Sequence, residues 1–341
     1  MDFLKLLFKC GLIGFNKSSQ VLSEVGIFFV RKKSGKLRLI LDCRRTNQYF
    51  RTPPSGSTTG LGALSGVRVP AGKTLYGSSY DIKDMFYRLR VPVWLQKYLG
   101  LPSLAAGEVR QHFGDVIPAD WGNDVSVSPT FLVLPMVFSW SFCFAQEVLR
   151  EAIRVSLPHV QFVVDRSPVG EVGDSCSLAM AYADNGYHFS TSRDVAEDDA
   201  RTVEQYLNKI GLATHEETVA CSTCIVLGGA LDGSGLVLRP KASRIGLLCS
   251  GLLAIEKGRP ISGKQMEHIV GHLNFVCLTQ RLSLSVLSHT YTYIHECYHL
   301  RRPVWKTVKR ELRNMRGGDA TACRKFRGQS LPLCLHVRCL S

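Results

Sequence analysis

The sequence predicts an α+β fold in which β-hairpins come first and helices follow. Two β-rich stretches, 26–41 and 177–190, are each interrupted by a short polar turn, which is typical of antiparallel hairpins. Apolar residues recur at helical spacing in 138–153, and the pattern becomes mainly helical from about residue 241. Strands that precede a separate run of helices favour the α+β class, with a boundary near Pro240.

Three strands and a loop are expected in the first half of the chain. A hairpin is predicted from the runs 26–30 and 37–41, joined through Ser34-Gly35. Residues 51–74 are rich in Gly, Pro, Ser and Thr, which predicts a loop. A further strand is expected to lead into Asp81.

The second half adds helices and two more hairpins. Helices are expected over 138–153 and 196–210, and the hairpin between them is expected to turn at Asn185-Gly186, a typical two-residue hairpin turn. Another hairpin, 223–238, is predicted to turn at Asp232-Gly233-Ser234-Gly235. The final segments, in order, are expected to be helices over 263–277 and 304–315 and a poorly ordered tail over 316–341.

The charge of the chain favours a polyanionic partner. Lys and Arg number 42 against 28 Asp and Glu, which gives a formal net charge of +14 over 341 residues. Such an excess favours nucleic acid through long-range attraction and counterion release. A basic surface that serves only solubility is the alternative at this point.

The cysteines and the apolar segments predict the cellular compartment of the protein. Twelve cysteines without regular spacing predict reduced thiols in an intracellular protein, in the nucleus or the cytoplasm. Lys5 and Lys9 interrupt the apolar N-terminus, which favours a short amphipathic helix over a signal peptide. The uncharged run 125–146 contains two prolines and four serines, so no membrane span is expected.

Two aspartates are the candidate catalytic residues. Asp81 is expected at the end of a strand and Asp184 at or beside a hairpin tip. Carboxylates on adjacent strands can bridge a pair of Mg²⁺ or Mn²⁺ ions, the arrangement that nucleotidyl transfer requires. Taken singly, either aspartate is more typical of a turn cap.

The order of several motifs resembles reverse transcriptases, particularly those of long-terminal-repeat retrotransposons. Each motif is weak alone, and their order and spacing carry the resemblance over about residues 25–281. The motifs are VRKKSGKLR at 30–38, LDCRRTN at 41–47, YDIKDMF at 80–86, LPMVFSWS at 134–141, YADN at 182–185, IVLGG at 225–229 and GHLNF at 271–275.

The resemblance implies a right-hand polymerase fold with fingers, an antiparallel palm sheet and a helical thumb or connection. Expected regions are an extension at 1–24, fingers and palm at 25–240, thumb or connection at 241–315 and a tail at 316–341. The implied activity is RNA-directed DNA polymerisation, in which dNTPs are added to a primer 3′-end on an RNA or DNA template with two Mg²⁺ or Mn²⁺ ions.

Residue roles follow from the resemblance by position. Asp81 and Asp184 are the implied metal ligands, with Asn185 beside them in the catalytic set. The implied substrate-binding residues are Lys32, Lys33 and Arg38 for the triphosphate, Phe86 beneath the sugar, and Met136 and Tyr182. Leu227 and Gly228 are the implied primer grip.

The chain also departs from the family pattern. Asn185 replaces a second Asp, Val137 a Gly, and Met136 a polar or aromatic side chain, while Thr218 lies where a lysine is expected. A β-branched residue cannot readily adopt the positive φ or allow the close approach that Gly permits. A divergent or degenerate copy is expected, and the alternative function is a catalytically inactive remnant that binds nucleic acid.

A more distant alternative is a zinc hydrolase. His295-Glu296-Cys297-Tyr298-His299 matches H-E-x-x-H, which on a helix places two imidazoles on one face. Glu311 is the only acidic candidate nearby for a third ligand, and its spacing fits poorly.

Overall fold

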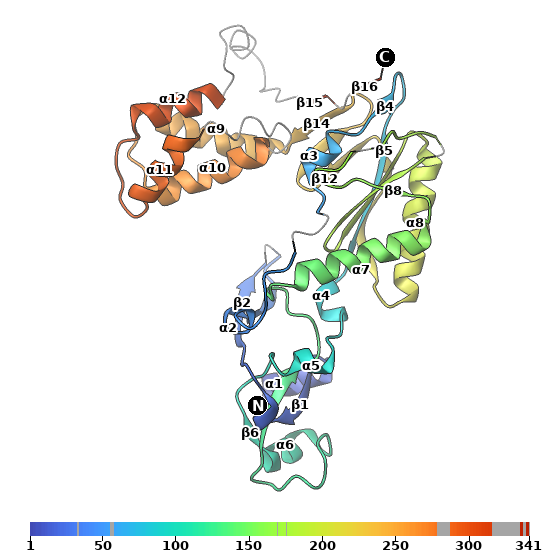
Figure 1. Ribbon diagram of the computed structural model, residues 1–341, viewed down its shortest axis with the longest axis vertical. Coiled ribbons are helices and arrows are strands. Elements are labelled where there is room, and N and C mark those ends of the chain that lie inside the picture. The colour runs from blue at the N-terminus through green and yellow to red at the C-terminus, as the bar shows by residue number, and fades with distance from the viewer. Residues whose placement is uncertain are drawn as a thin grey trace.

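The computed structural model describes residues 1–32, 34–54, 58–168, 170–174, 176–277, 287–315, 335–336 and 339–340. A central sheet lies between an N-terminal region at one end and a group of helices at its side (Figure 1). The predicted α+β class is confirmed.

The central sheet has five strands in the order β11 (Thr214–Cys221), β5 (Tyr76–Ile82), β10 (Asn185–Ser190), β9 (Leu178–Tyr182), β8 (Gln161–Phe162). All neighbouring pairs are antiparallel except β8 and β9, which are parallel. The strand that the sequence predicts before Asp81 is therefore β5, and β10 lies beside it.

Helices α7 (Ser141–Ser156) and α8 (Arg193–Lys209) pack on one face of this sheet. Alternate residues of β5 are buried in their core, which Leu149 of α7 and Val203 of α8 also enter. Helix α7 begins three residues later than the predicted start at 138, because Pro135 and the residues after it form turns. The Ser141 hydroxyl donates a hydrogen bond to the Pro135 carbonyl at that start.

The hairpin of β9 and β10 turns at Ala183-Asp184, so the predicted turn at Asn185-Gly186 is wrong. Both of the latter residues already pair within β10. Gly186 has a different role: a Cβ there would lie 2.3 Å from the Tyr80 ring. The glycine allows the close approach of an aromatic side chain from β5.

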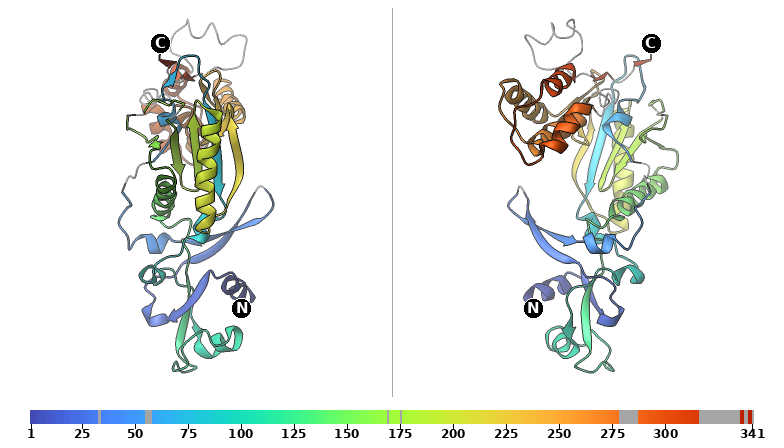
Figure 2. Two further views of the ribbon diagram at one scale, coloured as in Figure 1. Left: turned by 90° about the vertical axis from the view of Figure 1, so that its right-hand side faces the viewer. Right: turned by 60° about the vertical axis from the view of Figure 1, so that its left-hand side comes forward.

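The N-terminal region consists of two small sheets with short helices. The predicted hairpin is confirmed as β2 (Gly26–Arg31) paired with β3 (Leu37–Asp42), and it projects away from the central sheet (Figure 2). The expected amphipathic helix is also confirmed as α1. The other elements are α1 (Asp2–Lys9), β1 (Ile13–Lys17), η1 (Ser18–Gln20), α2 (Arg44–Asn47), α4 (Met85–Arg88), α5 (Val93–Gln96), β6 (Leu104–Ala105), α6 (Ala106–Phe113) and β7 (Ser126–Phe131).

A second sheet follows the central one in the order β12 (Thr223–Val226), β13 (Gly229–Asp232), β14 (Val237–Pro240), β15 (Leu335–His336). The predicted turn after Asp232 is confirmed between β13 and β14. An additional turn at Leu227-Gly228 joins β12 to β13. The stretch 51–74, predicted as a loop, contains the short elements α3 (Leu61–Leu64) and β4 (Val69–Pro70), of which β4 pairs with β16 (Cys339–Leu340).

Four helices follow residue 241, where the sequence predicts a change to helices. They pack around a core of their own. They are α9 (Ala242–Glu256), α10 (Gly263–Cys277), α11 (Ser288–Glu296) and α12 (Lys306–Met315). Of the predicted tail, 335–336 and 339–340 lie in strands, and the rest of 316–341 lies outside the described residues. Within the described parts of the chain, no helix combines the length and apolarity of a membrane span.

Candidate active site

Asp81 and Asp184 lie side by side at one end of the central sheet. Asp81 is the next-to-last residue of β5, and its backbone partner in β10 is Asn185, the residue after Asp184. The main-chain nitrogen of Ile82 donates a hydrogen bond of 2.8 Å to the main-chain oxygen of Asp184. The turn residue Asp184 therefore lies next to the end of β5, and both aspartates line one cleft.

The turn that carries Asp184 has a strained conformation and a specific support. Ala183 has φ of 53°, a left-handed conformation that costs a residue with a Cβ free energy. Gln146 of α7, which is buried, accepts a hydrogen bond of 2.8 Å from the Ala183 nitrogen and donates one of 2.7 Å to the Ala181 oxygen. One side chain thus satisfies two backbone groups next to Asp184.

His215 of β11 lies next to Asp81, and the sequence did not indicate this residue. Its Nε2 lies 3.6 Å from Oδ2 of Asp81, and its Nδ1 lies 3.0 Å from the Asp81 carbonyl oxygen. The resemblance predicted a lysine at position 218, where this chain has Thr218. Thr218 pairs with Ser79, and a register shift in β11 separates it from His215. Because of that shift, counting along the chain could not identify His215.

Asn185 contributes an amide where the motif that the sequence resembles has a carboxylate. Its Nδ2 donates a hydrogen bond of 2.9 Å to Oδ1 of Asp184. The donor orients the Asp184 carboxylate and adds no negative charge beside it. Two carboxylates, an amide and an imidazole therefore meet at this end of the sheet.

One cleft opens from the carboxylates toward the β2–β3 hairpin. It has a volume of about 870 Å³, and we call it the hairpin cleft. Both Asp81 and Asp184 line it. Other lining residues include His215 and the four predicted substrate-binding residues Lys32, Arg38, Phe86 and Met136. Lys33, which was predicted to share the role of Lys32, lies outside the described residues.

Contacts join the β2–β3 hairpin to α4 and to the loop before α7. The Tyr87 hydroxyl donates a hydrogen bond of 2.6 Å to the carbonyl of Leu39 in β3. A guanidinium nitrogen of Arg38 lies 4.0 Å from the sulfur of Met136. Basic side chains of the hairpin and the two carboxylates thus line one cleft, a charge pattern that suits a phosphate-bearing ligand.

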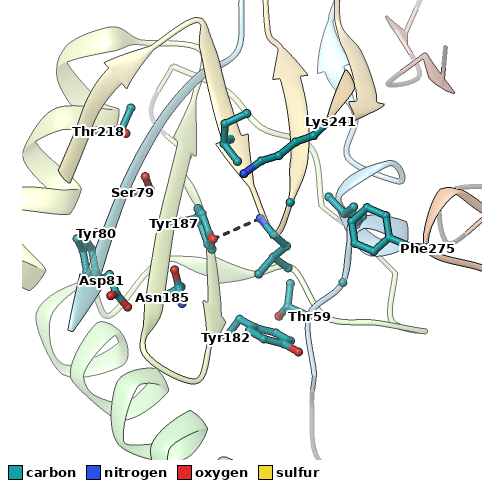
Figure 3. Close-up of a pocket in the computed structure, with 15 residues that line it drawn as sticks. Thr59, Ser79, Tyr80, Asp81, Tyr182, Asn185, Tyr187, Thr218, Lys241 and Phe275 are labelled. Carbon is teal, nitrogen blue, oxygen red and sulfur yellow. Dashed lines mark hydrogen bonds between the residues drawn. The ribbon is translucent and has the colours of Figure 1, made fainter. Parts of the chain in front are cut away.

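A second cleft, of about 610 Å³, opens from Asp81 on the other side, and we call it the sheet cleft (Figure 3). Asp81 and Asn185 lie at one end, and Lys241 and Phe275 lie at the other. It contains the remaining predicted site residues, Tyr182, Leu227 and Gly228, together with Thr218.

The β12–β13 turn is attached to the sheet in this cleft. The Leu227 nitrogen donates a hydrogen bond of 3.3 Å to the Tyr187 hydroxyl, and Leu227 has φ of 46°. Burial raises the pKa of Tyr187, so its hydroxyl stays neutral and available as an acceptor. The bond connects the turn to β10, the strand that pairs with β5 and its Asp81.

Val137 fits its loop without the backbone conformation that glycine would offer. Its φ is not among the positive values of the described residues. Asn47 holds the loop, since its Nδ2 donates to the Val137 carbonyl at 3.3 Å and its Oδ1 accepts from the Ser139 nitrogen at 2.9 Å. Val137 therefore does not have the positive φ that would strain a β-branched residue.

The helix-facing side of the sheet behind Asp81 contains buried titratable groups. The Tyr80 hydroxyl lies 3.2 Å from Nε2 of His188, and the two rings stack. Complete burial lowers the pKa of His188 to about 3. Burial and then the charge of Glu217 raise the pKa of Glu204 on α8 to about 7.

The arrangement required for the zinc alternative is not formed. Helix α11 ends at Glu296, so His299 does not follow His295 on the helix. Glu311 is engaged elsewhere, by the His289 ring at 2.8 Å and the Thr290 hydroxyl at 2.7 Å. In the described ranges, no three His, Cys, Asp or Glu side chains gather in a group able to hold a metal.

Comparison with solved structures identifies the fold. No protein-family model matches the sequence, and no curated protein matches it. The chain is similar to a structure of the foamy viral protease-reverse transcriptase in complex with double-stranded DNA, with a TM-score of 0.56 and 15% identity over 96% of this chain and 56% of that chain. It has a reverse-transcriptase-like fold.

Two further foamy viral structures agree with this assignment. The dRH form of the same protease-reverse transcriptase with double-stranded DNA matches with a TM-score of 0.57, covering 91% of this chain and 45% of that chain. The protease-reverse transcriptase with an RNA/DNA hybrid matches with a TM-score of 0.58, covering 91% and 34%. Both are 15% identical, and the chain spans less than two thirds of each reverse transcriptase.

Proposed function

We propose that this chain is the polymerase core of an RNA-directed DNA polymerase from a long-terminal-repeat type retroelement. One observation carries the proposal: Asp81 near the end of β5 and Asp184 in the β9–β10 turn line the hairpin cleft together, and Asp81 also lines the sheet cleft. The hairpin cleft combines basic residues with the two carboxylates, which suits an incoming dNTP. The sheet cleft suits the 3′-end of a primer, so that both reactants meet at Asp81.

The donor set suits Mg²⁺ or Mn²⁺. These ions prefer oxygen ligands, and Mg²⁺ is typically held by one or two carboxylates together with substrate phosphates and water. Asp81 and Asp184 would hold them, and Asn185 would add no charge. When bound, two ions would supply activation of the primer hydroxyl and neutralisation of the triphosphate.

The remaining residues act by position and charge. Lys32 and Arg38 attract and orient the triphosphate, and Phe86 lies in the hairpin cleft where a sugar would rest, so that its ring leaves no room for a 2′-hydroxyl. Leu227 and Gly228 support the primer end from the β12–β13 turn. Partners are template-primer nucleic acid and dNTPs, in the nucleus or the cytoplasm.

Primer extension tests the proposal. The purified chain is given an RNA template, a DNA primer, dNTPs and Mg²⁺ or Mn²⁺, and we expect extension that Asp81→Asn and Asp184→Asn abolish. Losing a charge-stabilising group typically lowers the rate by about a hundredfold or more. Asp198→Asn is the matched control, because it makes the same change at an exposed aspartate of α8 that lines neither cleft, and this variant should extend.

A negative result has a defined meaning. Wild-type extension no greater than that of an Asp81→Asn/Asp184→Asn double variant rejects the enzyme and leaves the nucleic-acid-binding remnant. Salt-dependent binding of the same template-primer then distinguishes this remnant from a protein with no nucleic-acid function.

A further inference from the structure

Apolar side chains are exposed on neighbouring parts of α1 and the β2–β3 hairpin. On α1, Leu6 is 57% and Phe3 37% exposed, and on the hairpin Phe29 is 49% exposed. We call Phe3, Leu6 and Phe29 the apolar patch. None of the three lines the hairpin cleft or the sheet cleft. Large apolar side chains that adjoin one another on a surface are typical of an interaction site.

Helix α1 has more apolar residues than its packing uses. Leu7 is buried in the N-terminal core, and Leu4 and Phe8 are half-buried against it. Phe3 and Leu6, three residues apart, form a second apolar row that faces outward. A surface helix usually has polar side chains outside the stripe that packs on the core. Folding therefore does not account for the outward row.

The hairpin extends the apolar surface of α1. The rings of Phe3 and Phe29 meet edge to face, with their centroids 5.6 Å apart. Phe29 pairs with Leu39, and Arg31 pairs with Leu37. Because alternate residues of a strand point to one face, Phe29, Arg31 and Leu37 share the face that contacts α1. Leu37 is 62% exposed and also lines the hairpin cleft, so exposed apolar side chains continue along the hairpin toward that cleft.

The charges beside the apolar patch are mostly positive. Lys5 and Lys9 of α1 and Arg31 of β2 are exposed, and none of them forms an ion pair with another described residue. Asp2 is the only acidic residue of α1, and β2 has none. Exposed apolar side chains next to cations are typical of proteins that bind anionic membranes, because the apolar groups enter the acyl boundary while the cations meet the headgroups.

The shape and the charge of this region favour lipid over a protein partner. The apolar patch lies partly on a hairpin that projects from the body of the protein (Figure 2), and a fluid lipid surface can cover a projection without a matching hollow. A specific protein interface requires a closely complementary surface. A second copy of this chain would bring the same cations together across a symmetric contact, and like charges oppose it.

We propose that the apolar patch binds an anionic lipid surface. Phe3, Leu6 and Phe29 enter the acyl boundary, and Lys5 and Lys9 bind the headgroups. The contact is peripheral, since the side chains come from a short helix and a hairpin that pack on the rest of the N-terminal region. It goes beyond the proposed function and does not depend on catalysis.

Vesicle flotation tests the inference. The full chain, freed of nucleic acid, is mixed with vesicles of phosphatidylcholine alone or of phosphatidylcholine with phosphatidylserine. We expect wild type to float with the second kind only. Leu6→Ser/Phe29→Ser should lower the partition constant by about tenfold or more, because transferring one large apolar side chain out of water changes it by roughly that factor. Lys5→Gln and Lys9→Gln should each lower it by about fivefold.

Two variants keep this comparison specific. Leu247→Ser/Leu253→Ser is the matched control, because these leucines of α9 are 62% and 47% exposed and lie far from α1 in the chain. It should partition as wild type does. Phe29→Trp should retain binding, since indole rings favour the membrane interface.

Two results would overturn the inference. Equal partition constants for wild type and Leu6→Ser/Phe29→Ser would assign vesicle binding to the net charge of the chain. Wild type that floats with neither vesicle would remove lipid as the partner, and a dimer in sedimentation that Leu6→Ser/Phe29→Ser abolishes would then identify a second copy. Primer extension is measured without vesicles, so its absence counts against the proposed function alone.

Discussion

The side-chain amide of Gln146 bridges two backbone groups on either side of Tyr182, with its oxygen 2.8 Å from the Ala183 nitrogen and its nitrogen 2.7 Å from the Ala181 oxygen. Strand β9 pairs with β8 only through Leu178 and Ala179, so no described strand reaches this part of its edge. A helix side chain therefore completes the hydrogen bonding of the sheet next to the candidate catalytic residue.

Replacing Gln146 with Leu should lower both stability and primer extension. Two buried backbone groups lose a partner, at a cost of about 1–3 kcal/mol in the free energy of unfolding. The turn at Ala183 loses its support, so Asp184 is less well placed. Urea unfolding and extension rates, corrected for the folded fraction, measure the two effects.

Ser156→Ala is the control for Gln146→Leu. It removes a hydrogen bond of 2.7 Å from the Ser156 hydroxyl to the Ala152 carbonyl near the other end of α7. We expect extension by this variant to equal that of wild type. If Gln146→Leu also extends normally per folded molecule, the bridge is structural and does not position Asp184.

Asn185→Asp should make the chain more dependent on divalent ions. The change removes the donor to Asp184 and adds a like charge, which lowers the unfolding free energy without metal by about 1 kcal/mol or less at this partly exposed site. It also supplies an additional oxygen ligand, so added Mn²⁺ should raise the melting temperature more than in wild type. Adding Asp184→Asn should remove that gain, and a gain that persists would place the ion elsewhere.

Gly186→Ala should destabilise the sheet because its Cβ would lie 2.3 Å from the buried Tyr80 ring. Overpacking of this kind costs about 1–3 kcal/mol. Gly246→Ala in α9, where a Cβ meets nothing within 4 Å, should instead stabilise by about 0.5–1 kcal/mol. Thermal unfolding compares the two, and a neutral Gly186→Ala would mean that the Tyr80 ring can move.

His188 should make the folded state less stable as the pH falls. Its pKa is about 3 in the folded state against an ordinary value of 6.5, so below pH 6.5 the unfolded chain binds a proton that the folded chain does not. The stability contribution is present above pH 6.5 and falls by up to about 1.4 kcal/mol per pH unit toward pH 3. Urea unfolding of wild type and His188→Asn between about pH 4 and pH 8 measures the difference.

Glu204 should act in the opposite direction. Its pKa rises from 4.5 to about 7 on folding, so its contribution is present below pH 4.5 and is lost as the pH rises through 7. The two effects oppose each other between pH 4.5 and 6.5. The net loss of stability from pH 6.5 to pH 4.5 should therefore be steeper in Glu204→Gln than in wild type, and an equal slope in the two proteins would contradict this account.

The β2–β3 hairpin, the strand before Asp81 and the hairpin beside Asp184 were accessible from the sequence, because hydrophobic periodicity and local turns carry that information. Strands β1, β7 and β11 and the order of strands in the sheets were not predicted. The exact hairpin turn was not. Asn185-Gly186 is a favourable turn locally, yet Tyr80 needs the space above Gly186, and this requirement comes from a strand about a hundred residues away in the chain. Tertiary packing overrode the local preference.

Gln146 and His215 were missed for a related reason. A glutamine on a helix with an apolar face and a histidine in a polar strand carry no motif. Gln146 could have been noticed as a polar residue on the buried face between Phe142 and Leu149, where burial requires hydrogen-bond partners. The β11 irregularity between His215 and Thr218 leaves no sequence pattern.

Asp81 is the residue common to both clefts, and this has an evolutionary consequence. When two substrates meet at one carboxylate, selection acts most strongly on the few residues around that carboxylate. The other residues that line the two clefts can change, provided that the shape of each cleft is kept. A lineage can then exchange most of its side chains and still present the same meeting point. The similarity of this fold to the foamy viral structures at 15% identity shows how far side chains can differ while the arrangement of the backbone stays the same.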